Sequence, residues 1–439
     1  MSGIPESTAP ATTASEGLNN RHMRRILASS FLGSAVEYYD FLLYATAAAV
    51  VFNHVFFTGL GPGLAAFASF GTLAAGYVAR PLGGVLFGHF GDRLGRKKVL
   101  VVSMLTMGLA TTLIGLLPPT SQLGAAAPVL LVTLRIVQGL AVGGEWGGAM
   151  TIALEHAPGG KRGFAASFAN MGAPAGALLA TVAVGLCTLL PEDDFLRWGW
   201  RIPFLFSMVL VLIGLFIRLK VTESPLFTRF EAEAKERRLP IVEVLTGHGR
   251  QVVVGLLAGI SMFTLAGMAT VWAVNVAVAN GADKTGVLNS KAAAALVMLV
   301  TTIVSARVCD RLGRKPVMVT GVLGAMAFAY PQLLLVESGS VLGFTVAVMG
   351  AQALQGIVFG PYAAFLAELF PTRIRFTGAS LCFQGASTLG AGFTPALAAG
   401  LVVAGGGGMA LLGAVWVGVL AVCLVAILAA KEGRSRDLG

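Results

Sequence analysis

The chain has 439 residues, of which 56% are hydrophobic and 12% are charged, and its net charge is +10. Soluble domains carry about 25% charged residues. A mean hydropathy of +0.81 therefore excludes an ordinary soluble protein and indicates that lipid covers much of the surface. The four cysteines are isolated, which gives no metal-binding or redox spacing.

The predicted elements alternate between long apolar spans and short polar loops. Residues 1–25 are polar, and we expect a disordered cytoplasmic tail. Six spans, a charged linker at 222–250, six more spans and a tail at 431–439 follow. The sequence thus predicts an all-α membrane protein of twelve transmembrane helices, with six-helix bundles at 26–221 and 251–430. The expected spans are 27–53, 64–90, 98–117, 128–154, 163–190, 201–221, 251–279, 287–308, 317–336, 340–366, 376–402 and 408–430.

The Lys and Arg residues are distributed unevenly over the loops. If twelve spans alternate in direction, the loops on the side of the termini hold 25 of the 31 basic residues, and the opposite loops hold 4. The other two, Arg80 and Arg135, fall inside spans. Basic loops stay in the cytoplasm, so we expect both termini to be cytoplasmic. The positive charge then indicates topology and anionic lipid as a neighbour, not nucleic acid.

The sequence repeats itself in the two halves. GDRLGRK (91–97) recurs as CDRLGRK (309–315), and Gln138-Gly139 recurs as Gln355-Gly356. In both halves the DRLGRK loop lies between the second and third spans. Both copies then face the same side of the membrane, which indicates a parallel repeat.

The DRLGRK loops are predicted to form a charge latch that stabilises one of two conformations. Gly91 and Gly95 permit a tight turn, and Asp92 can accept hydrogen bonds at a helix end. A plain turn in a basic loop is the simpler interpretation, but its recurrence favours the latch. The predicted latch comprises Gly91, Asp92, Arg93, Gly95, Arg96, Asp310, Arg311 and Arg314, with Arg80 and Glu145 as a supporting pair.

GHFGDRLGRKK (88–98) and RIVQG (135–139) resemble two signature motifs of the major facilitator superfamily. The chain also resembles, more narrowly, the metabolite:proton symporter family, which includes permeases for shikimate, α-ketoglutarate, citrate and proline/betaine, and its first half is most similar to shikimate permeases. The resemblance implies a major facilitator fold, in which spans one and four meet. The motifs that carry it are VEYYDFLLY (36–44), RPLGGVLFGHFGDRLGRKK (80–98), VGGEWGGA (142–149), WGWRIPFLFS (198–207), ESPLF (223–227) and ELFPTRIRFTGAS (368–380).

Charged residues inside the spans of the first half are expensive to bury and are functional candidates. Glu37 and Asp40 are three residues apart and share a helix face. At a rise of about 1.5 Å per residue, Asp40 and Arg135 fall at one depth, and Arg80 and Glu145 fall at another. We expect two carboxylate–arginine pairs. The Asp40–Arg135 pair is favoured as functional, and the Arg80–Glu145 pair as structural.

The spans of the second half offer neutral polar residues instead. Gln352 stands where Arg135 stands in the first half. We interpret this as a division of roles, in which the first half handles charge and the second half supplies neutral hydrogen bonds. Polar contacts between helices are an equally good interpretation of any single residue. The expected substrate-binding residues are Arg135, Tyr38, Gln138, Gln352, Gln355, Tyr362 and Gln384.

These patterns predict a secondary transporter and not an enzyme. The chain has no GxxxxGK[ST], HExxH or GxSxG segment, and we expect no cofactor or metal. Asp40, with Glu37 as relay, is expected to bind the proton, and Arg135 to anchor a carboxylate. We expect a monomer in the bacterial inner membrane that takes up a small organic acid anion, such as shikimate or a di- or tricarboxylate, with protons. A proline/betaine-type zwitterion symporter and a passive uniporter are the alternatives.

Overall fold

The computed structural model describes residues 11–223 and 240–433. Helices make up nearly all of this range, and it contains no β-strand. The first half comprises α1 (Ala11–Val50), α2 (Phe52–Val55), α3 (Pro62–Leu94), α4 (Arg96–Leu116), α5 (Thr120–Leu123), α6 (Ala126–His156), η1 (Gly159–Lys161), α7 (Arg162–Ala166), α8 (Phe168–Cys187), α9 (Glu192–Asp194), η2 (Phe195–Gly199) and α10 (Arg201–Leu219).

The second half repeats this plan after the linker. It comprises α12 (Pro240–Gly247), α13 (Gly249–Gly267), η3 (Met268–Trp272), α14 (Ala273–Ala279), α15 (Lys284–Leu312), α16 (Arg314–Glu337), α17 (Val341–Leu369), η4 (Thr372–Ile374), α18 (Arg375–Ser387), η5 (Thr388–Gly392), α19 (Thr394–Ala404) and α20 (Ala410–Ala429). The predicted tail and linker segments 1–10, 224–239 and 434–439 lie outside the described residues.

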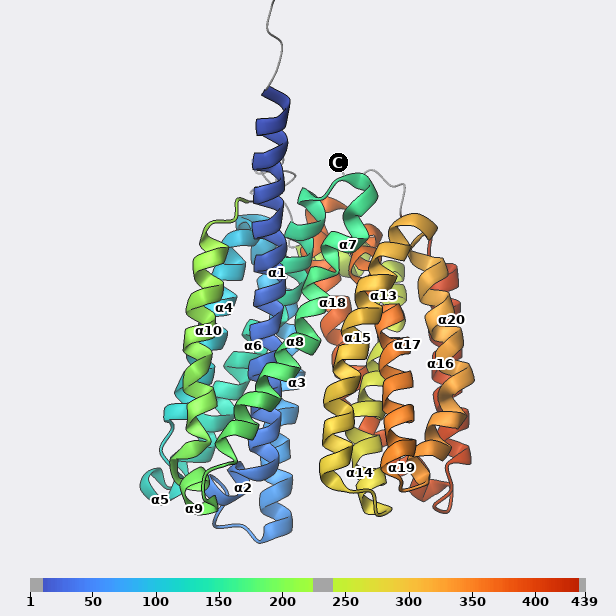
Figure 1. Cartoon of the computed structure of the whole chain (residues 1–439). Helices are drawn as coiled ribbons and strands as arrows, with labels where there is room; N and C mark the ends of the chain where they lie inside the picture. Colours follow the sequence, from blue (N-terminus) through green and yellow to red (C-terminus); the bar gives the residue numbers. More distant parts are fainter. Residues whose placement is uncertain (1–10, 224–239, 434–439) are drawn as a thin grey trace, which may run out of the picture.

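Each of the twelve expected spans coincides with one long helix or with consecutive helical segments. In the described part of the chain, ten helices are long and apolar enough to cross a membrane. The other two long helices, α1 and α3, run alongside them (Figure 1). Glu37 and Asp40 near the middle of α1 lower its hydropathy. The predicted fold class, twelve membrane helices in two six-helix halves, is confirmed.

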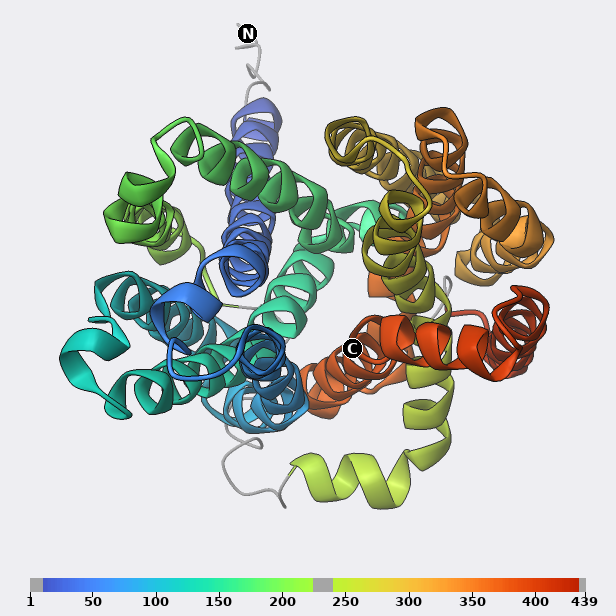
Figure 2. The ribbon, with the colours of Figure 1, turned by 90° about the horizontal axis from the view of Figure 1, so that it is seen from below.

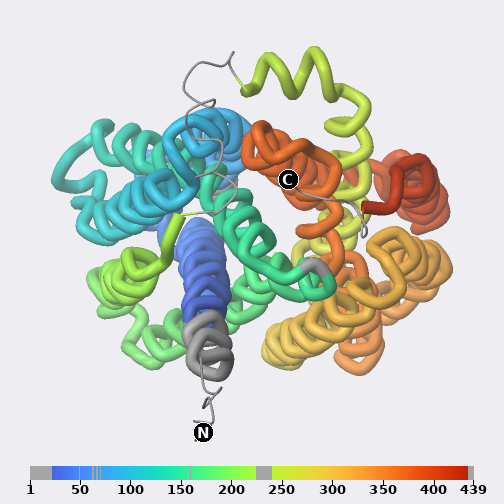
Figure 3. Tube along the Cα trace, turned by 90° about the horizontal axis from the view of Figure 1, so that it is seen from above, coloured from blue at the N-terminus to red at the C-terminus, as the bar shows by residue number. Residues whose placement is uncertain are grey.

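The two halves stand side by side as separate bundles (Figure 1), and views along the helices show the two groups clearly (Figures 2 and 3). The chain enters α1 and leaves α20 at the same end of the molecule, where α7 also lies. We refer to this end as the termini side. The short helices α2, α5 and α9 lie at the opposite side. The linker helix α12 packs against α18 and α3, so it contacts both halves.

Helix α1 begins well before the membrane span. The described helix starts at Ala11, and the predicted disordered cytoplasmic tail at 1–25 stays a prediction. Extending an existing helix adds one hydrogen bond for each residue fixed, whereas starting a new helix is costly. The span already supplies the nucleus, so the preceding residues continue it.

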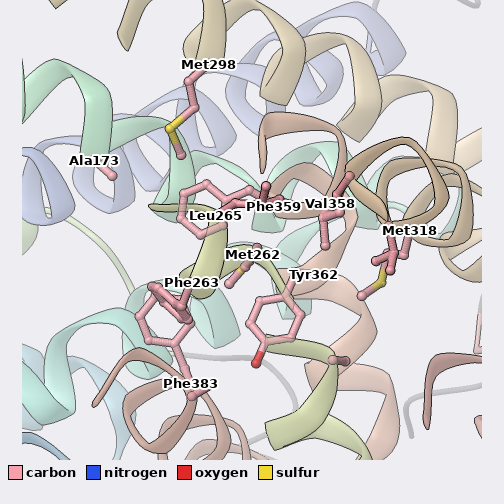
Figure 4. Close-up of a cluster of buried hydrophobic side chains, with 14 of the residues drawn as sticks. Ala173, Met262, Phe263, Leu265, Met298, Met318, Val358, Phe359, Tyr362 and Phe383 are labelled. Atoms are coloured by element: carbon pink, nitrogen blue, oxygen red, sulfur yellow. The ribbon is translucent and has the colours of Figure 1, made fainter. Parts of the chain in front are cut away.

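One hydrophobic cluster joins the two halves. Its members come mainly from the second half, but Trp146 and Ala173 of the first half belong to it. Figure 4 shows Ala173 beside the side chains of the second half, with Phe263 and Phe383 close together. Among the described residues, all hydrogen bonds and ion pairs between the halves lie between the termini side and the level of Tyr77, near the middle of α3. The halves are therefore closed against each other on the termini side.

The eleventh span is interrupted at mid-membrane. After α18 the backbone forms the π-helical segment η5, and α19 begins with Pro395 in its first turn. The hydroxyl of Thr388 in η5 donates to the carbonyl of Tyr77 at 3.0 Å, across the boundary between the halves. Single π-helical turns inside helices are frequent at functional sites. This irregularity places η5 against the part of α3 that carries Arg80.

Candidate functional site

Close packing of α3 on α6 positions the two buried arginines. A Cβ added at Gly83 would lie 2.6 Å from the backbone carbonyl carbon of Leu140, so only glycine permits this approach. A Cβ at Gly76 would lie 3.1 Å from Cδ of Arg135. Position 76 therefore leaves room for the Arg135 side chain.

Asp40 lies at the centre of a polar network within the first half. Its side chain is fully buried. One carboxylate oxygen accepts a hydrogen bond from the Thr111 hydroxyl of α4 at 2.8 Å, and the other accepts one from the Ser207 hydroxyl of α10 at 2.5 Å. Two neutral hydroxyls from two further helices thus hold the carboxylate.

Arg135 reaches this network through intermediates. Its Nη1 donates to Oε1 of Gln138 at 2.5 Å, and Nε2 of Gln138 donates to Oγ1 of Thr111 at 2.7 Å. Asp40 and Arg135 belong to one network, as their shared depth predicted. The expected direct pair is wrong, however, because no ion pair within 4.0 Å joins them. The rotation of α6 about its axis turns Arg135 toward aromatic rings.

Arg80 and Arg135 both lie against one aromatic ring, that of Phe41. The guanidinium carbon of Arg80 is 4.2 Å from the Phe41 ring centroid, and that of Arg135 is 5.0 Å from it. Arg135 also lies 4.0 Å from the centre of Tyr44, and Arg80 lies 5.1 Å from that of Tyr77. Within the described part of the chain, neither arginine has a carboxylate partner within 4.0 Å. Two buried cations thus share an aromatic setting without direct neutralisation.

The partner of Glu145 is Arg218 and not Arg80, so the second predicted pair is wrong. Arg218 Nη2 lies 2.6 Å from a Glu145 oxygen, and both side chains are about 1% exposed. The Ser103 hydroxyl donates to the other oxygen of Glu145 at 3.0 Å. Arg218 lies near the end of the expected span 201–221, and the count of basic residues above includes it with the loops on the side of the termini. Its long side chain instead turns back into the bundle.

Glu37 is a second buried carboxylate of α1, close enough to Arg80 and Arg218 to interact with both electrostatically. It is 1% exposed, and its Oε2 has no hydrogen-bond partner in the described structure. Arg80, Glu145 and Arg218 all act on it electrostatically, Arg80 most strongly. Glu37 therefore lies within the same charged interior as Asp40, but it interacts with different arginines.

The predicted residues of the second half are buried, and several have unused acceptors. The side-chain amide oxygens of Gln352, Gln355 and Gln384 lack hydrogen-bond partners among the described residues. The Gln384 amide donates to the backbone carbonyl of Val142 in the first half at 3.3 Å. The described hydrogen bonds do not join these amides to Asp40 or Arg135. The structure thus places neutral acceptors in the second half without bringing them to the charged network.

An aromatic stack closes the space between the halves on the termini side of Arg135. Trp146 of α6 lies parallel to Phe383 of α18, with ring centroids 3.7 Å apart. The predicted substrate residue Tyr362 packs beside both rings, and its hydroxyl donates to the carbonyl of Gly255 at 3.0 Å. The other aromatic candidate, Tyr38, is half-buried and packs against the same cluster. Eleven residues of α6, about 16 Å, separate Trp146 from Arg135.

The aspartates of the two DRLGRK loops each bind a helix start in the opposite half. Asp92 accepts from the backbone N–H groups of Phe376 and Thr377 at 3.3 and 2.9 Å, at the first turn of α18. Asp310 accepts from the backbone N–H groups of Gly163 and Phe164 at 2.8 and 2.9 Å, at the first turn of α7. A carboxylate at a helix N-terminus satisfies free N–H groups and the helix dipole.

Ion pairs surround these aspartates in both halves. Glu155 bridges Arg96 of its own half, at 3.4 Å, and Arg375 of the other half, at 2.7 Å. In the second half Arg314 pairs with Glu368 at 2.9 Å and with Asp310 at 3.0 Å. The remaining predicted latch residues, Arg93 and Arg311, lie at the rim, partly exposed and exposed respectively.

The two latch glycines have different tasks. Gly95 adopts φ 103° at the break between α3 and α4, a conformation that favours glycine. Gly91 lies inside α3, so its predicted part in the turn is wrong. A Cβ at position 91 would lie 3.3 Å or less from ring atoms of Phe376. Gly91 therefore allows α18 of the other half to approach.

Sequence reasoning missed a second matched pair of acidic residues. Glu223 accepts from the backbone N–H groups of Arg96 and Lys97, each at 3.1 Å, at the start of α4. Glu432 accepts from those of Arg314 and Lys315, each at 3.0 Å, at the start of α16. Each glutamate follows the last span of its half, and this common position was the available signal. The hydroxyls of Thr111 and Ser207 gave no signal, because such residues are ordinary in apolar spans.

Two six-helix bundles related by a parallel repeat, with charged residues buried at mid-membrane, define a secondary transporter of the membrane. The chain belongs to the major facilitator superfamily, because residues 30–381 match the model of that family. It is a multi-pass membrane transporter and not an enzyme.

Curated relatives support the narrower resemblance to metabolite:proton symporters. The chain is 40% identical to the inner membrane metabolite transport protein YhjE of Escherichia coli, over 96% of each chain. It is 40% identical to the shikimate transporter of Escherichia coli, over 90% of this chain and 92% of the relative. It is also 33% identical to the proline/betaine transporter of Salmonella typhimurium, over 96% of this chain and 86% of the relative.

The fold also matches a solved structure. The structure of the proton:xylose symporter XylE bound to 6-bromo-6-deoxy-D-glucose superimposes with a TM-score of 0.77. The alignment covers 96% of this chain and 98% of that one, at 19% sequence identity. This likeness supports the twelve-helix major facilitator architecture.

Proposed function

We propose that the protein takes up a small organic acid anion together with protons, by alternating access across the cytoplasmic membrane. The observation that carries this proposal is the pair of buried arginines, Arg80 and Arg135, which lack a direct carboxylate partner beside the Asp40 network. Unneutralised cations are costly inside a membrane, and an arriving carboxylate offsets that cost. The proton gradient is the energy source, without a cofactor.

The geometry favours an acid over a zwitterion. An arginine matches a carboxylate through two parallel hydrogen bonds. A quaternary ammonium needs open aromatic faces, but Arg135 lies over Tyr44 and both arginines lie against Phe41. A shikimate-like hydroxy acid fits the proposal best, because the side-chain amide oxygens of Gln352 and Gln355 can accept hydrogen bonds from its hydroxyl groups.

In this proposal Asp40 carries the coupled proton, with Glu37 as the second carboxylate of the path. Asp40 is buried, is held by neutral hydroxyls and interacts electrostatically with Arg135. A substrate carboxylate at Arg135 competes with Asp40 for the same cation. Protonation of Asp40 removes this competition, so the anion and the proton bind together.

In this proposal, alternating access requires the contacts that hold the two halves together on the termini side to break and re-form. The latch and the Trp146–Phe383 stack hold the halves together on the termini side. Because basic loops face the cytoplasm, we assign the termini side to the cytoplasm and this conformation to the outward-facing state. Thiol labelling of Lys284→Cys in intact cells, in a cysteine-free background, tests the orientation. If the Lys284→Cys variant stays unlabelled while a cysteine placed in 229–238 is labelled, the assignment is contradicted.

The proposed function is tested by an uptake screen and by Asp40→Asn. The screen uses a permease-deficient host with shikimate, protocatechuate, α-ketoglutarate, citrate, proline and betaine. Asp40→Asn is expected to abolish accumulation against a gradient but to retain exchange of internal for external substrate, because Asn resembles a protonated carboxyl group. Normal accumulation by the variant overturns the assignment of Asp40. Wild-type uptake that survives collapse of the proton gradient identifies a uniporter.

A further inference from the structure

The hydrogen bonds between Arg135 and Asp40 all point in one direction. Arg135 donates to Gln138, Gln138 donates to Thr111, and Thr111 donates to Asp40, at 2.5, 2.7 and 2.8 Å. Every donor therefore points toward the carboxylate, as expected when Asp40 is charged. Such chains polarise each link, so a change at one end alters the bond at the other.

Thr111 has a second acceptor within reach. Its hydroxyl carries one proton and lies 2.8 Å from Oδ2 of Asp40 and 2.9 Å from the carbonyl oxygen of Met107. A hydroxyl donates one hydrogen bond and accepts up to two. When Asp40 is charged, the Thr111 proton belongs on the carboxylate. When Asp40 is protonated, its own O–H can donate to Thr111, and the Thr111 proton turns to Met107.

We propose that Thr111 and Gln138 form a hydrogen-bond relay through which the protonation of Asp40 controls the availability of Arg135 to the substrate. This inference rests on the proposed function and names the residues that connect its two sites. Thr111 and Gln138 act as positioning residues.

The relay produces coupling of the correct sign for symport. A charged Asp40 draws the donors toward itself and increases the partial negative charge on Oε1 of Gln138, which then holds Arg135. A protonated Asp40 donates into the chain instead and weakens that hold. Arg135 can then turn both arms of its guanidinium toward a carboxylate. Proton binding therefore favours anion binding, and linkage requires the reverse as well.

Among the described hydrogen bonds, the relay is the path that joins Asp40 to Arg135, and the charged and titratable groups around Asp40 are few. Arg135 on α6 is the cation that acts on Asp40 electrostatically, and Tyr39 is its titratable neighbour on α1. On α3, Arg80 acts on Arg135 and on Glu37. From α8, Cys187 acts on Tyr39, whereas α4 and α10 present the neutral hydroxyls of Thr111 and Ser207.

Ser207 provides a matched control. Its hydroxyl donates to the other oxygen of Asp40 at 2.5 Å, but it has no link to Gln138 or Arg135 among the described contacts. Ser207→Ala and Thr111→Val each delete one donor to the carboxylate. Both are expected to shift the pH profile of uptake in the same direction, because each removes a hydrogen bond that stabilises the charged form of Asp40. Only Thr111→Val also interrupts the relay.

The test measures substrate affinity against pH in the purified full-length protein in liposomes. The probe is whichever of shikimate, protocatechuate, α-ketoglutarate, citrate, proline and betaine the wild type binds most tightly. We expect wild-type affinity to change by about tenfold between acidic and alkaline pH, as is typical of coupled sites. Thr111→Val and Gln138→Leu should lose most of this dependence, whereas Thr111→Ser and Ser207→Ala should retain it.

Each outcome decides between the two proposals. A pH-dependent wild type with an equally pH-dependent Thr111→Val overturns the relay and leaves the proposed function intact. A wild type whose affinity does not depend on pH, or that binds none of the six probes, overturns the proposed function together with the relay. Equal loss of pH dependence in Thr111→Val and Ser207→Ala assigns the effect to Asp40 hydration and also overturns the relay.

Discussion

The two halves are nearly identical at the termini side and different at mid-membrane. At the rim, Asp92 and Asp310 bind helix starts across the interface in the same way, and Glu223 and Glu432 cap equivalent helices. At mid-membrane the first half buries charged side chains, whereas the second half buries neutral glutamines.

This difference separates two tasks. A duplicated latch suits a movement in which both halves rotate about a common interface, since each half must hold and release the other. Chemistry at mid-membrane needs one proton site and one anion site, so a single charged half suffices. The following four predictions test this separation: the first concerns substrate binding, the second stability, the third the latch and the fourth the helix caps.

The most severe test compares equivalent positions in the two halves. Arg135→Lys replaces a fork that binds a carboxylate bidentately with a point charge. Losing a charge-assisted hydrogen bond costs about 1.5–3 kcal/mol, so we expect the KM of uptake to rise by about ten- to a hundredfold. Gln352→Leu removes a neutral bond worth about 1 kcal/mol and should raise KM by about fivefold. Equal effects at equal expression would contradict the division of roles.

The buried pair between α6 and α10 should dominate stability. Glu145→Gln leaves Arg218 charged and unpaired, which costs about 3–5 kcal/mol, and should lower the denaturation temperature in detergent. Adding Arg218→Gln should recover much of the loss. The matched control adds Arg80→Gln to Glu145→Gln, and no recovery is expected there. Recovery with Arg80→Gln and none with Arg218→Gln would instead support the Arg80–Glu145 pair that the sequence predicted.

The latch should respond equally in both halves. Asp92→Asn and Asp310→Asn each replace one acceptor oxygen with an NH2 group that faces backbone N–H donors. Each should destabilise the closed termini side and slow transport several-fold at equal expression. Ser380→Cys, buried where α18 contacts Gly147 of α6, should then react faster with a thiol reagent. Wild-type transport rates and unchanged labelling would contradict the latch and show that both DRLGRK loops are simple turns.

The smallest effects are expected at the helix caps. Glu223→Gln and Glu432→Gln each keep one of the two acceptor oxygens, place an NH2 group at the other, and remove the charge that interacts with the helix dipole. The expected loss is about 0.3–1 kcal/mol in each case, measured as a shift of thermal denaturation that high salt diminishes. A large loss in only one variant would show that the two rims are not equivalent.

The sequence predicted the fold and the depth of the buried charges, but not their partners. Apolar length determines a span almost alone, so all twelve coincide with helices. Depth followed from counting residues, and Asp40 and Arg135 do share a network. The rotation of each helix is set by packing, for example where Gly83 meets Leu140, and no sequence count supplies it. Arg218 was missed because an arginine at a helix end reaches inward as easily as outward.

Trp146 has a further consequence for experiments on this transporter. Of the five tryptophans in the chain, it is the one whose ring stacks on a side chain of the opposite half, 3.7 Å from Phe383. Its Nε1 also donates to Asn170, whose amide reaches the carbonyl of Phe359. Separation of the halves removes the Phe383 ring from the indole and exposes the indole to water, which shifts its emission to longer wavelength. The native protein therefore contains an optical probe of its own alternation, and emission from Trp146 can follow the opening step without an attached dye.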